Sequence, residues 1–160
     1  MHKPTVRRGE FFMTMVDITG KPKVFREAKA TGKIRLKAET VRLIRNGKIE
    51  KGDPIYTAKI AGTLAAKETS ILIPFCHPLP LTNVKVDVEI ADDTTIKVSS
   101  TVKTEAQTGV EMEALVATAV SLLTIWDMVK QYEKDAEGQY PTTVIEEIRV
   151  VRKVKEEKPK

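Results

Sequence analysis

The alternation of apolar and polar residues along the chain predicts four β-strands. Segments 84–90 and 96–102 place apolar or small residues at alternate positions, with Asp92-Asp93 between them. A strand that buries one face shows this period of two, so the two segments predict an antiparallel hairpin. Alternation at 33–37 and 144–154 predicts an earlier and a final strand. The inward positions expected in the final strand are Ile148 and Val150.

Two helices are expected between the first strand and the hairpin. Residues 39–45 predict a short helix that Asn46-Gly47 stops. Asp53 and Pro54 predict the start of a second, because Asp is a preferred N-cap and Pro fits the first helical position. The small residues of this helix allow close packing against another element. It is expected to end before 70–81, where three prolines exclude a regular helix.

The most apolar segment predicts a long helix from Gly109 to about Glu133. Thr108 and Glu111 fit a capping box, in which each side chain bonds the other's backbone N–H, and this would give Glu111 a structural role. The order strand, helices, two strands, helix, strand predicts an α+β fold. We expect a ferredoxin-like antiparallel sheet with helices packed on one face.

The length of 160 residues and the 41% apolar fraction fit a single globular domain and exclude general disorder. We expect a flexible arm at 1–14, one domain at 15–155 and a charged tail at 156–160. The net charge of +5 suits an anionic ligand or weak nucleic-acid binding and decides neither.

Cysteine content and hydropathy point to a soluble, cytoplasmic protein. The single cysteine, Cys76, excludes an intramolecular disulfide and a cysteine-based zinc cage, and it fits a reducing compartment. No signal peptide is visible. The uncharged, strongly apolar run 114–126 is thirteen residues long, whereas a membrane span needs roughly 20.

Ionisable residues at both ends of the long helix are candidates for chemistry. Asp127 and Lys130 are i, i+3 neighbours, so they could form an ordinary surface ion pair or, beside Trp126, a partly buried acid/base pair. Glu113 and Asp127 point to nearly the same side, but fourteen residues place them about 21 Å apart. If both serve one site, they come from different subunits.

Three further residues have both a structural and a functional interpretation. Lys51 precedes the Asp53-Pro54 helix start, where a phosphate would suit the exposed N–H groups, but it could be an ordinary loop lysine. Cys76 and His77 lie in the proline-rich segment. One cysteine and one histidine do not make a metal site, and neighbouring side chains of an extended segment point apart, which disfavours a nucleophile pair.

Taken together, the motifs indicate a family. The chain resembles the cyclic pyranopterin monophosphate synthase (MoaC) family of molybdenum cofactor biosynthesis from about Met15 to Asp135. The matching segments, in order, are Met15-Val16-Asp17-Ile18, Val24-Phe25-Arg26-Glu27-Ala28, Lys51-Gly52-Asp53, Ala58-Lys59-Ile60-Ala61-Gly62, 72–79, 108–115 and 123–130.

The resemblance implies a ferredoxin-like homohexamer, a trimer of dimers with sites between subunits. It implies a lyase that converts 3′,8-cyclo-7,8-dihydro-GTP, a small-molecule nucleotide, to cyclic pyranopterin monophosphate with release of pyrophosphate. No resident cofactor or metal is expected, and neither nucleic acid nor membrane is an expected partner. Mg²⁺ held by the substrate phosphates stays an open alternative, because it can bind through one carboxylate and substrate oxygens.

The resemblance also assigns residues. It implies catalytic roles for Lys51, Asp127 and Lys130, and substrate-binding segments at Phe75-Cys76-His77 and Met112-Glu113. Further pocket positions implied by the resemblance are Asp17, Arg26, Lys67 and Glu111. The chemistry agrees, because a triphosphate needs cations, guanine-derived rings offer N–H donors to a carboxylate, and ring opening needs proton transfers.

Two departures and two alternatives accompany this interpretation. Residues 152–156 replace the lysine- and glycine-rich tail of many relatives, and Phe75 stands where an aliphatic residue is common. The first alternative is a basic nucleic-acid-binding module, which the lack of aromatic residues in the predicted strands disfavours. The second is a non-catalytic oligomeric scaffold, for which the candidate catalytic residues would be dispensable.

Overall fold

The computed structural model describes residues 13–156. The predicted arm at 1–14 falls almost wholly outside these residues, as does most of the tail at 156–160, so both stay predictions. The elements follow in the order β1 (Val24–Arg35), α1 (Ala38–Arg45), α2 (Pro54–Lys67), α3 (Thr69–Leu72), β2 (Leu81–Ile90), β3 (Thr95–Ala106), α4 (Glu111–Glu133) and β4 (Val144–Glu156).

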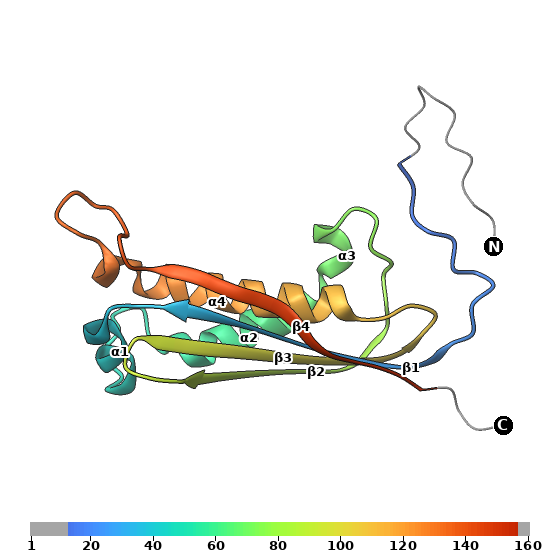
Figure 1. The fold of residues 1–160 in the computed structure, drawn as a ribbon, viewed down its shortest axis with the longest axis horizontal. Helices are drawn as coiled ribbons and strands as arrows, with labels where there is room; N and C mark the ends of the chain where they lie inside the picture. The colour runs from blue at the N-terminus through green and yellow to red at the C-terminus, as the bar shows by residue number, and fades with distance from the viewer. Residues whose placement is uncertain (1–12, 157–160) are drawn as a thin grey trace.

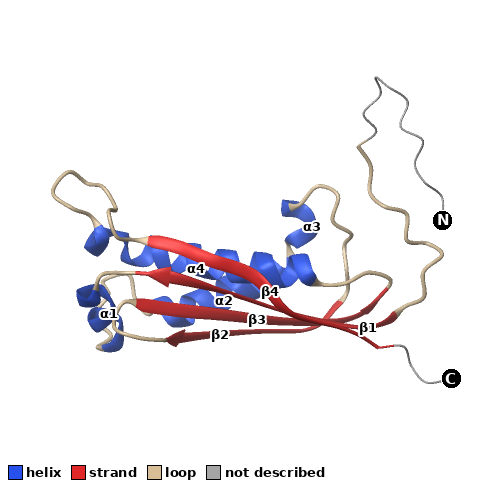
Figure 2. Ribbon diagram, in the orientation of Figure 1, coloured by secondary structure: helices blue, strands red, loops and turns tan. Residues whose placement is uncertain are grey.

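The four strands form one sheet in the order β2-β3-β1-β4, and every neighbouring pair is antiparallel. Because β3 lies between β1 and β2, the unit β1-α2-β2 is a split βαβ motif. Helices α2 and α4 pack side by side on one face, and no helix formed by residues 13–156 covers the opposite, open face (Figures 1 and 2). The predicted α+β, ferredoxin-like architecture is confirmed.

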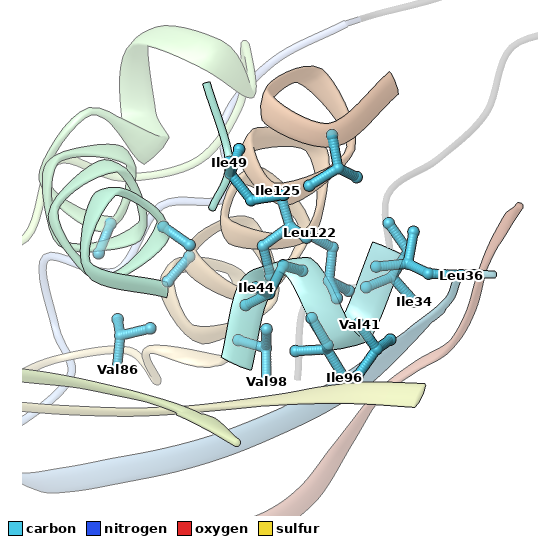
Figure 3. Packing of buried hydrophobic residues seen from close by; sticks show 14 residues of the cluster. Ile34, Leu36, Val41, Ile44, Ile49, Val86, Ile96, Val98, Leu122 and Ile125 are labelled. Atoms are coloured by element: carbon cyan, nitrogen blue, oxygen red, sulfur yellow. The ribbon is translucent and has the colours of Figure 1, made fainter. Parts of the chain in front are cut away.

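The main core lies between the sheet and α4. Ile34 of β1 and Val98 of β3 are fully buried with Leu122 and Ile125 of α4 (Figure 3). α4 is long and apolar enough by composition to cross a membrane, but half of its most apolar window is buried inside the protein. Its position in this core accounts for its apolar character.

Small residues let α2 and α4 approach closely, as the sequence predicted. A Cβ atom added to Gly62 would lie 2.1 Å from Ser121 Oγ and 2.9 Å from the Ala117 carbonyl oxygen. The Ser121 hydroxyl donates to the Ala58 carbonyl oxygen at 3.0 Å. The predicted start of α2 is also confirmed, because Asp53 accepts from two backbone N–H groups of its first turn at 2.8 and 3.1 Å.

The capping box predicted for α4 does not form. Val110 is the N-cap residue and makes no side-chain cap bond, while the Glu111 carboxylate pairs with Lys153 of β4. An ion pair to a lysine is stronger than a bond to a neutral backbone N–H. The partner comes from a strand more than forty residues away in the chain, so local sequence could not reveal it.

Three other details differ from the sequence predictions. β1 begins at Val24, nine residues earlier than the predicted strand, so Phe25 is a strand residue. Residues 69–72 form the one-turn helix α3 before the prolines. Ile148 lies against Gly32 on the helix-covered side, yet it remains 39% exposed because β4 is an edge strand.

Candidate active site

A lysine–aspartate cluster forms at the C-terminal end of α4. Asp127 Oδ1 lies 2.8 Å from Lys130 Nζ, and Asp127 Oδ2 lies 2.9 Å from Lys51 Nζ. The same Lys51 ammonium donates to the Asp127 carbonyl oxygen at 3.0 Å. The structure therefore brings together the three residues expected to be catalytic.

Two residues just beyond this cluster fix the loop that presents Lys51. The backbone N–H of Glu50 donates to the Tyr132 hydroxyl at 3.0 Å, and Gln131 donates to the Glu50 carboxylate at 3.0 Å. Gly52 follows with a φ of 101°, which glycine adopts without strain. The Lys51 ammonium thus points to Asp127, and its suggested role near the substrate phosphates stays a prediction. Tyr132 and Gln131 were missed in the sequence.

Electrostatics in the lysine–aspartate cluster favours the charged forms. The hydrogen bonds from Lys130 and then Lys51 lower the pKa of Asp127 from 3.8 to about 2. The hydrogen bond to Asp127 in turn raises the pKa of Lys130. The three side chains are about half exposed, at 45%, 56% and 46% for Lys51, Asp127 and Lys130. The partly buried setting expected beside Trp126 is therefore not present in the single chain.

The Glu113 pocket lies at the other end of α4. Its cavity has a volume of about 570 Å³, and Phe75, Cys76, His77 and Met112 are among its lining residues. Glu113 beside it is 3% exposed; one carboxylate oxygen lies 3.8 Å from Cys76 Sγ, and the other has no hydrogen-bond partner. Burial raises the pKa of Glu113, and burial likewise raises the pKa of the Cys76 thiol.

His77 is fixed in the same pocket by the segment before β1. Its Nε2 lies 2.8 Å from the Val16 carbonyl oxygen, and because a carbonyl can only accept, Nε2 carries the proton. Phe75 and Met112 are 49% and 39% exposed, so they offer apolar surface to a ligand. The two segments of the chain that the resemblance assigns to substrate binding therefore lie next to each other in the fold.

A cationic pocket of about 490 Å³ adjoins the Glu113 pocket and shares with it Lys21, Thr108, Gly109 and Glu111. Arg26 lines it, donates to the Gln107 carbonyl oxygen at 3.4 Å and leaves its buried Nε without a partner. Lys153 and Lys155 of β4 line it as well. These two lysines and Lys21 were not predicted as pocket residues from the sequence. The register that pairs Arg26 with Lys155 and Ala28 with Lys153 places the two strand lysines beside Arg26.

Asp17 and Lys67, which the resemblance also assigns to the pocket, do not line the Glu113 pocket or the cationic pocket. The Asp17 carboxylate accepts from the Thr19 backbone N–H at 2.9 Å, a hydrogen bond that lowers the pKa of Asp17. Its neighbours Val16 and Ile18 line the Glu113 pocket. Lys67 lines a separate depression of about 320 Å³ between α2 and β2, which shares only Leu79 with the Glu113 pocket.

The lysine–aspartate cluster and the Glu113 pocket lie towards opposite ends of α4, as the spacing of Glu113 and Asp127 indicated. One chain therefore does not bring the two sets of candidate residues together. Among residues 13–156, no group of three or more His, Cys, Asp or Glu side chains is arranged to hold a metal ion. Mg²⁺ held by the substrate phosphates stays the open alternative that the sequence left.

Comparison with known proteins identifies the family. The sequence model of the MoaC family matches residues 15–156. The chain belongs to the MoaC family. Among its curated relatives, a probable cyclic pyranopterin monophosphate synthase from Sulfolobus acidocaldarius is 60% identical, over 88% of this chain and 98% of the relative. The proteins of the same name from Saccharolobus solfataricus and Pyrococcus furiosus are 56% and 55% identical, over 89% and 90% of this chain and 95% and 92% of theirs.

MoaC family membership agrees with the resemblance carried by the sequence motifs. The match extends to β4, beyond the segment ending near Asp135 that the motifs covered. The family match therefore includes Lys153 and Lys155, the two strand lysines of the cationic pocket.

Proposed function

We propose that this protein is a cyclic pyranopterin monophosphate synthase, a lyase of molybdenum cofactor biosynthesis. Its substrate would be 3′,8-cyclo-7,8-dihydro-GTP and its products cyclic pyranopterin monophosphate and pyrophosphate. The observation that carries the proposal is a pair of buried atoms without partners. Arg26 Nε belongs to a residue that lines the cationic pocket, and Glu113 Oε2 belongs to a carboxylate that contacts Cys76, a lining residue of the adjoining cavity. Buried polar atoms are rarely left unpaired, so both are candidates to bind substrate.

The two cavities suit the two halves of such a nucleotide. In the Glu113 pocket, fused rings can lie against the apolar side chains of Phe75 and Met112. The Glu113 carboxylate, which contacts the lining residue Cys76, would accept the N–H donors of the rings. In the cationic pocket, the planar Arg26 guanidinium and the ammonium groups of Lys153 and Lys155 can bind phosphate oxygens. The fused rings would lie in the first and the triphosphate in the second.

The lysine–aspartate cluster would supply proton transfer from a second copy of the chain. A two-fold axis across the middle of α4 would place the C-terminal end of one α4 near the N-terminal end of its partner's α4. Tyr56, Ile60 and Leu64 form an exposed apolar stripe on α2, and Leu123 is exposed on α4. Covering these side chains would stabilise the dimer. Three such dimers would form the proposed hexamer.

Assembly would also change the chemistry of the cluster. In the single chain, Asp127 and Lys130 are held in their charged forms by mutual hydrogen bonds. Covering the cluster would remove water, and an incoming substrate group could displace Lys51 or Lys130 from Asp127. The sugar hydroxyl would attack the inner phosphorus, lose its proton, and expel pyrophosphate from that phosphorus. Positioning and neutralising cations favour this displacement.

The nucleic-acid alternative is not favoured. The open sheet face does carry one aromatic residue, Phe25, contrary to the sequence-based expectation, but Phe25 lies at the end of β1 opposite Glu105 and Glu156. One aromatic side chain between two acids is a poor stacking platform for bases. We further propose that the protein acts in the cytoplasm, where a nucleotide substrate is available.

The test is direct turnover. The purified protein is incubated with 3′,8-cyclo-7,8-dihydro-GTP, and pyrophosphate and cyclic pyranopterin monophosphate are followed by mass spectrometry. Wild type should form both, and a folded Lys130→Ala variant neither. Absence of product from folded, oligomeric wild type would overturn the proposal. Lys48→Ala is the matched control, because Lys48 is an exposed lysine of the Lys51 loop outside the cluster.

A further inference from the structure

The open face of the sheet is hollowed where β1, β3 and β4 meet. The concavity has a volume of about 390 Å³. Its polar lining includes the hydroxyls of Thr31 and Ser99, which face each other across β1 and β3. The charged side chains around them are Lys29, Lys33, Lys97 and Arg149, with Glu147 as the one carboxylate in the lining.

Irregular pairing of β4 shapes this concavity. The register of β4 on β1 shifts between Lys29 and Ala30 and again between Thr31 and Lys33. At the second shift Glu147 adopts a φ of 57°, unusual for a residue with a side chain. Such bulges bend a strand locally and re-aim its side chains. Here they bring Arg149 opposite Thr31, among Lys29, Lys33 and Lys97, which together with Arg149 we call the ring of cations.

The charges around the concavity are unbalanced. Lys33 and Lys97 lie directly opposite each other in the register, an arrangement of like charges that destabilises a sheet. Lys33 pairs with Glu147 at 2.9 Å and Lys97 with Glu89 at 3.6 Å. Among the described residues, no carboxylate oxygen lies within 4.0 Å of the charged groups of Lys29 or Arg149.

We propose that this concavity is a second anion site, for a compact polyphosphate group such as pyrophosphate, separate from the cationic pocket. A polyphosphate would relieve the repulsion between Lys33 and Lys97 and would accept hydrogen bonds from two hydroxyls and the Arg149 guanidinium. Acidic residues, including Glu27, Asp87 and Glu89, lie around the ring of cations on the same face of the sheet. They favour a compact anion over an extended nucleic-acid backbone, which would pass across them.

The test is calorimetric titration of the intact protein with inorganic pyrophosphate. It is made in an Arg26→Gln background, which weakens binding in the cationic pocket. Replacing Lys29 and Arg149 by Gln should reduce the remaining affinity about tenfold or more, because two charge-assisted contacts are lost. Replacing Lys85 and Lys103 by Gln is the matched control: it removes two charges from the same face outside the concavity, each already paired with an acid. This control should bind within about twofold of its parent.

A second measurement uses stability. Lys97→Gln should reduce the rise in melting temperature that pyrophosphate produces, because it removes one of the cations that line the concavity. Equal pyrophosphate binding by the Lys29/Arg149 variant and its parent would overturn the proposal. So would displacement of pyrophosphate by a short single-stranded oligonucleotide at equal phosphate concentration, which would assign the face to nucleic acid. Because substrate turnover does not enter either readout, failure here leaves the proposed enzymatic function untouched.

Discussion

Lys51 donates to both the side chain and the main-chain carbonyl of Asp127, at 2.9 Å and 3.0 Å. The contact joins the loop before α2 to the last turns of α4, two segments separated by seventy-six positions in the chain. A lysine held at two points has little freedom to turn elsewhere, so its ammonium is positioned for chemistry at Asp127.

Lys51→Ala and Asp127→Asn should each lower kcat by about 100-fold or more, the usual loss when a proton-transfer group is removed. Both side chains are about half exposed, so the variants should fold normally. Steady-state pyrophosphate release measures the effect, and Lys48→Ala should turn over normally. Normal kcat for Lys51→Ala would remove Lys51 from the catalytic group.

The Asp127 carboxylate should titrate near pH 2 in the wild-type chain, as followed by NMR of the side-chain carbons. Because its pKa is lowered from 3.8, its contribution to stability is fully present above about pH 4 and is lost as pH falls through about 2. Lys130→Met should return the pKa towards 3.8, because its largest cause is the Lys130 hydrogen bond. An unchanged Asp127 pKa in Lys130→Met would contradict the Lys130 hydrogen bond as the main cause of the lowered pKa.

Glu113→Gln should be at least as stable as wild type at neutral pH while losing about tenfold or more in kcat/KM. Burial raises the pKa of Glu113 above its ordinary 4.5, so ionising it opposes folding. The stability that the protein has with Glu113 neutral is fully present below pH 4.5, and it is lost as pH rises through the folded-state pKa of Glu113. Urea denaturation at a series of pH values measures it. As pH rises above 4.5, the free energy of unfolding should fall less in Glu113→Gln than in wild type. An equal dependence of the free energy of unfolding on pH in the two proteins would refute the prediction.

Mixing two impaired variants should raise activity above that of either one if the site lies between subunits. Lys130→Ala damages the lysine–aspartate cluster and Glu113→Gln damages the Glu113 pocket. In a mixed two-fold dimer, one of the two sites takes both halves from undamaged ends, so random mixing should recover about a quarter of wild-type activity. Co-refolded mixtures are assayed for pyrophosphate release. Activity no higher than that of the separate variants would place each complete site within one chain.

Gly62→Ala should destabilise the fold by roughly 1–3 kcal/mol. The added Cβ would meet Ser121 Oγ at 2.1 Å and the Ala117 carbonyl oxygen at 2.9 Å, which forces α2 and α4 apart. Gly20→Ala is the control, because no heavy atom lies within 4 Å of a Cβ at that position. Thermal unfolding of both variants measures the difference. Equal melting temperatures would show that the helices can separate without cost.

Local patterns in the sequence predicted most of the fold. The hairpin of β2 and β3, the Asp53 cap of α2 and the length of α4 each depend on neighbouring residues, so periodicity and capping were enough to find them. The first half of β1 was missed because Ala28, Ala30 and Gly32 bury too little side chain to mark an inward face. The failed capping box of α4 depended on Lys153, which no local pattern relates to Glu111.

By itself, the sequence determined the family, the type of fold and the identity of most candidate site residues, because these depend on local periodicity and on motifs in a fixed order. Only the tertiary structure decided which of those residues meet. Lys51 faces Asp127, Tyr132 holds the Lys51 loop, and Lys153 and Lys155 join Arg26 in one pocket. These contacts depend on strand register and on helix packing. Both are properties of the whole sheet, since a register shift of one residue turns every side chain of a strand to the other face.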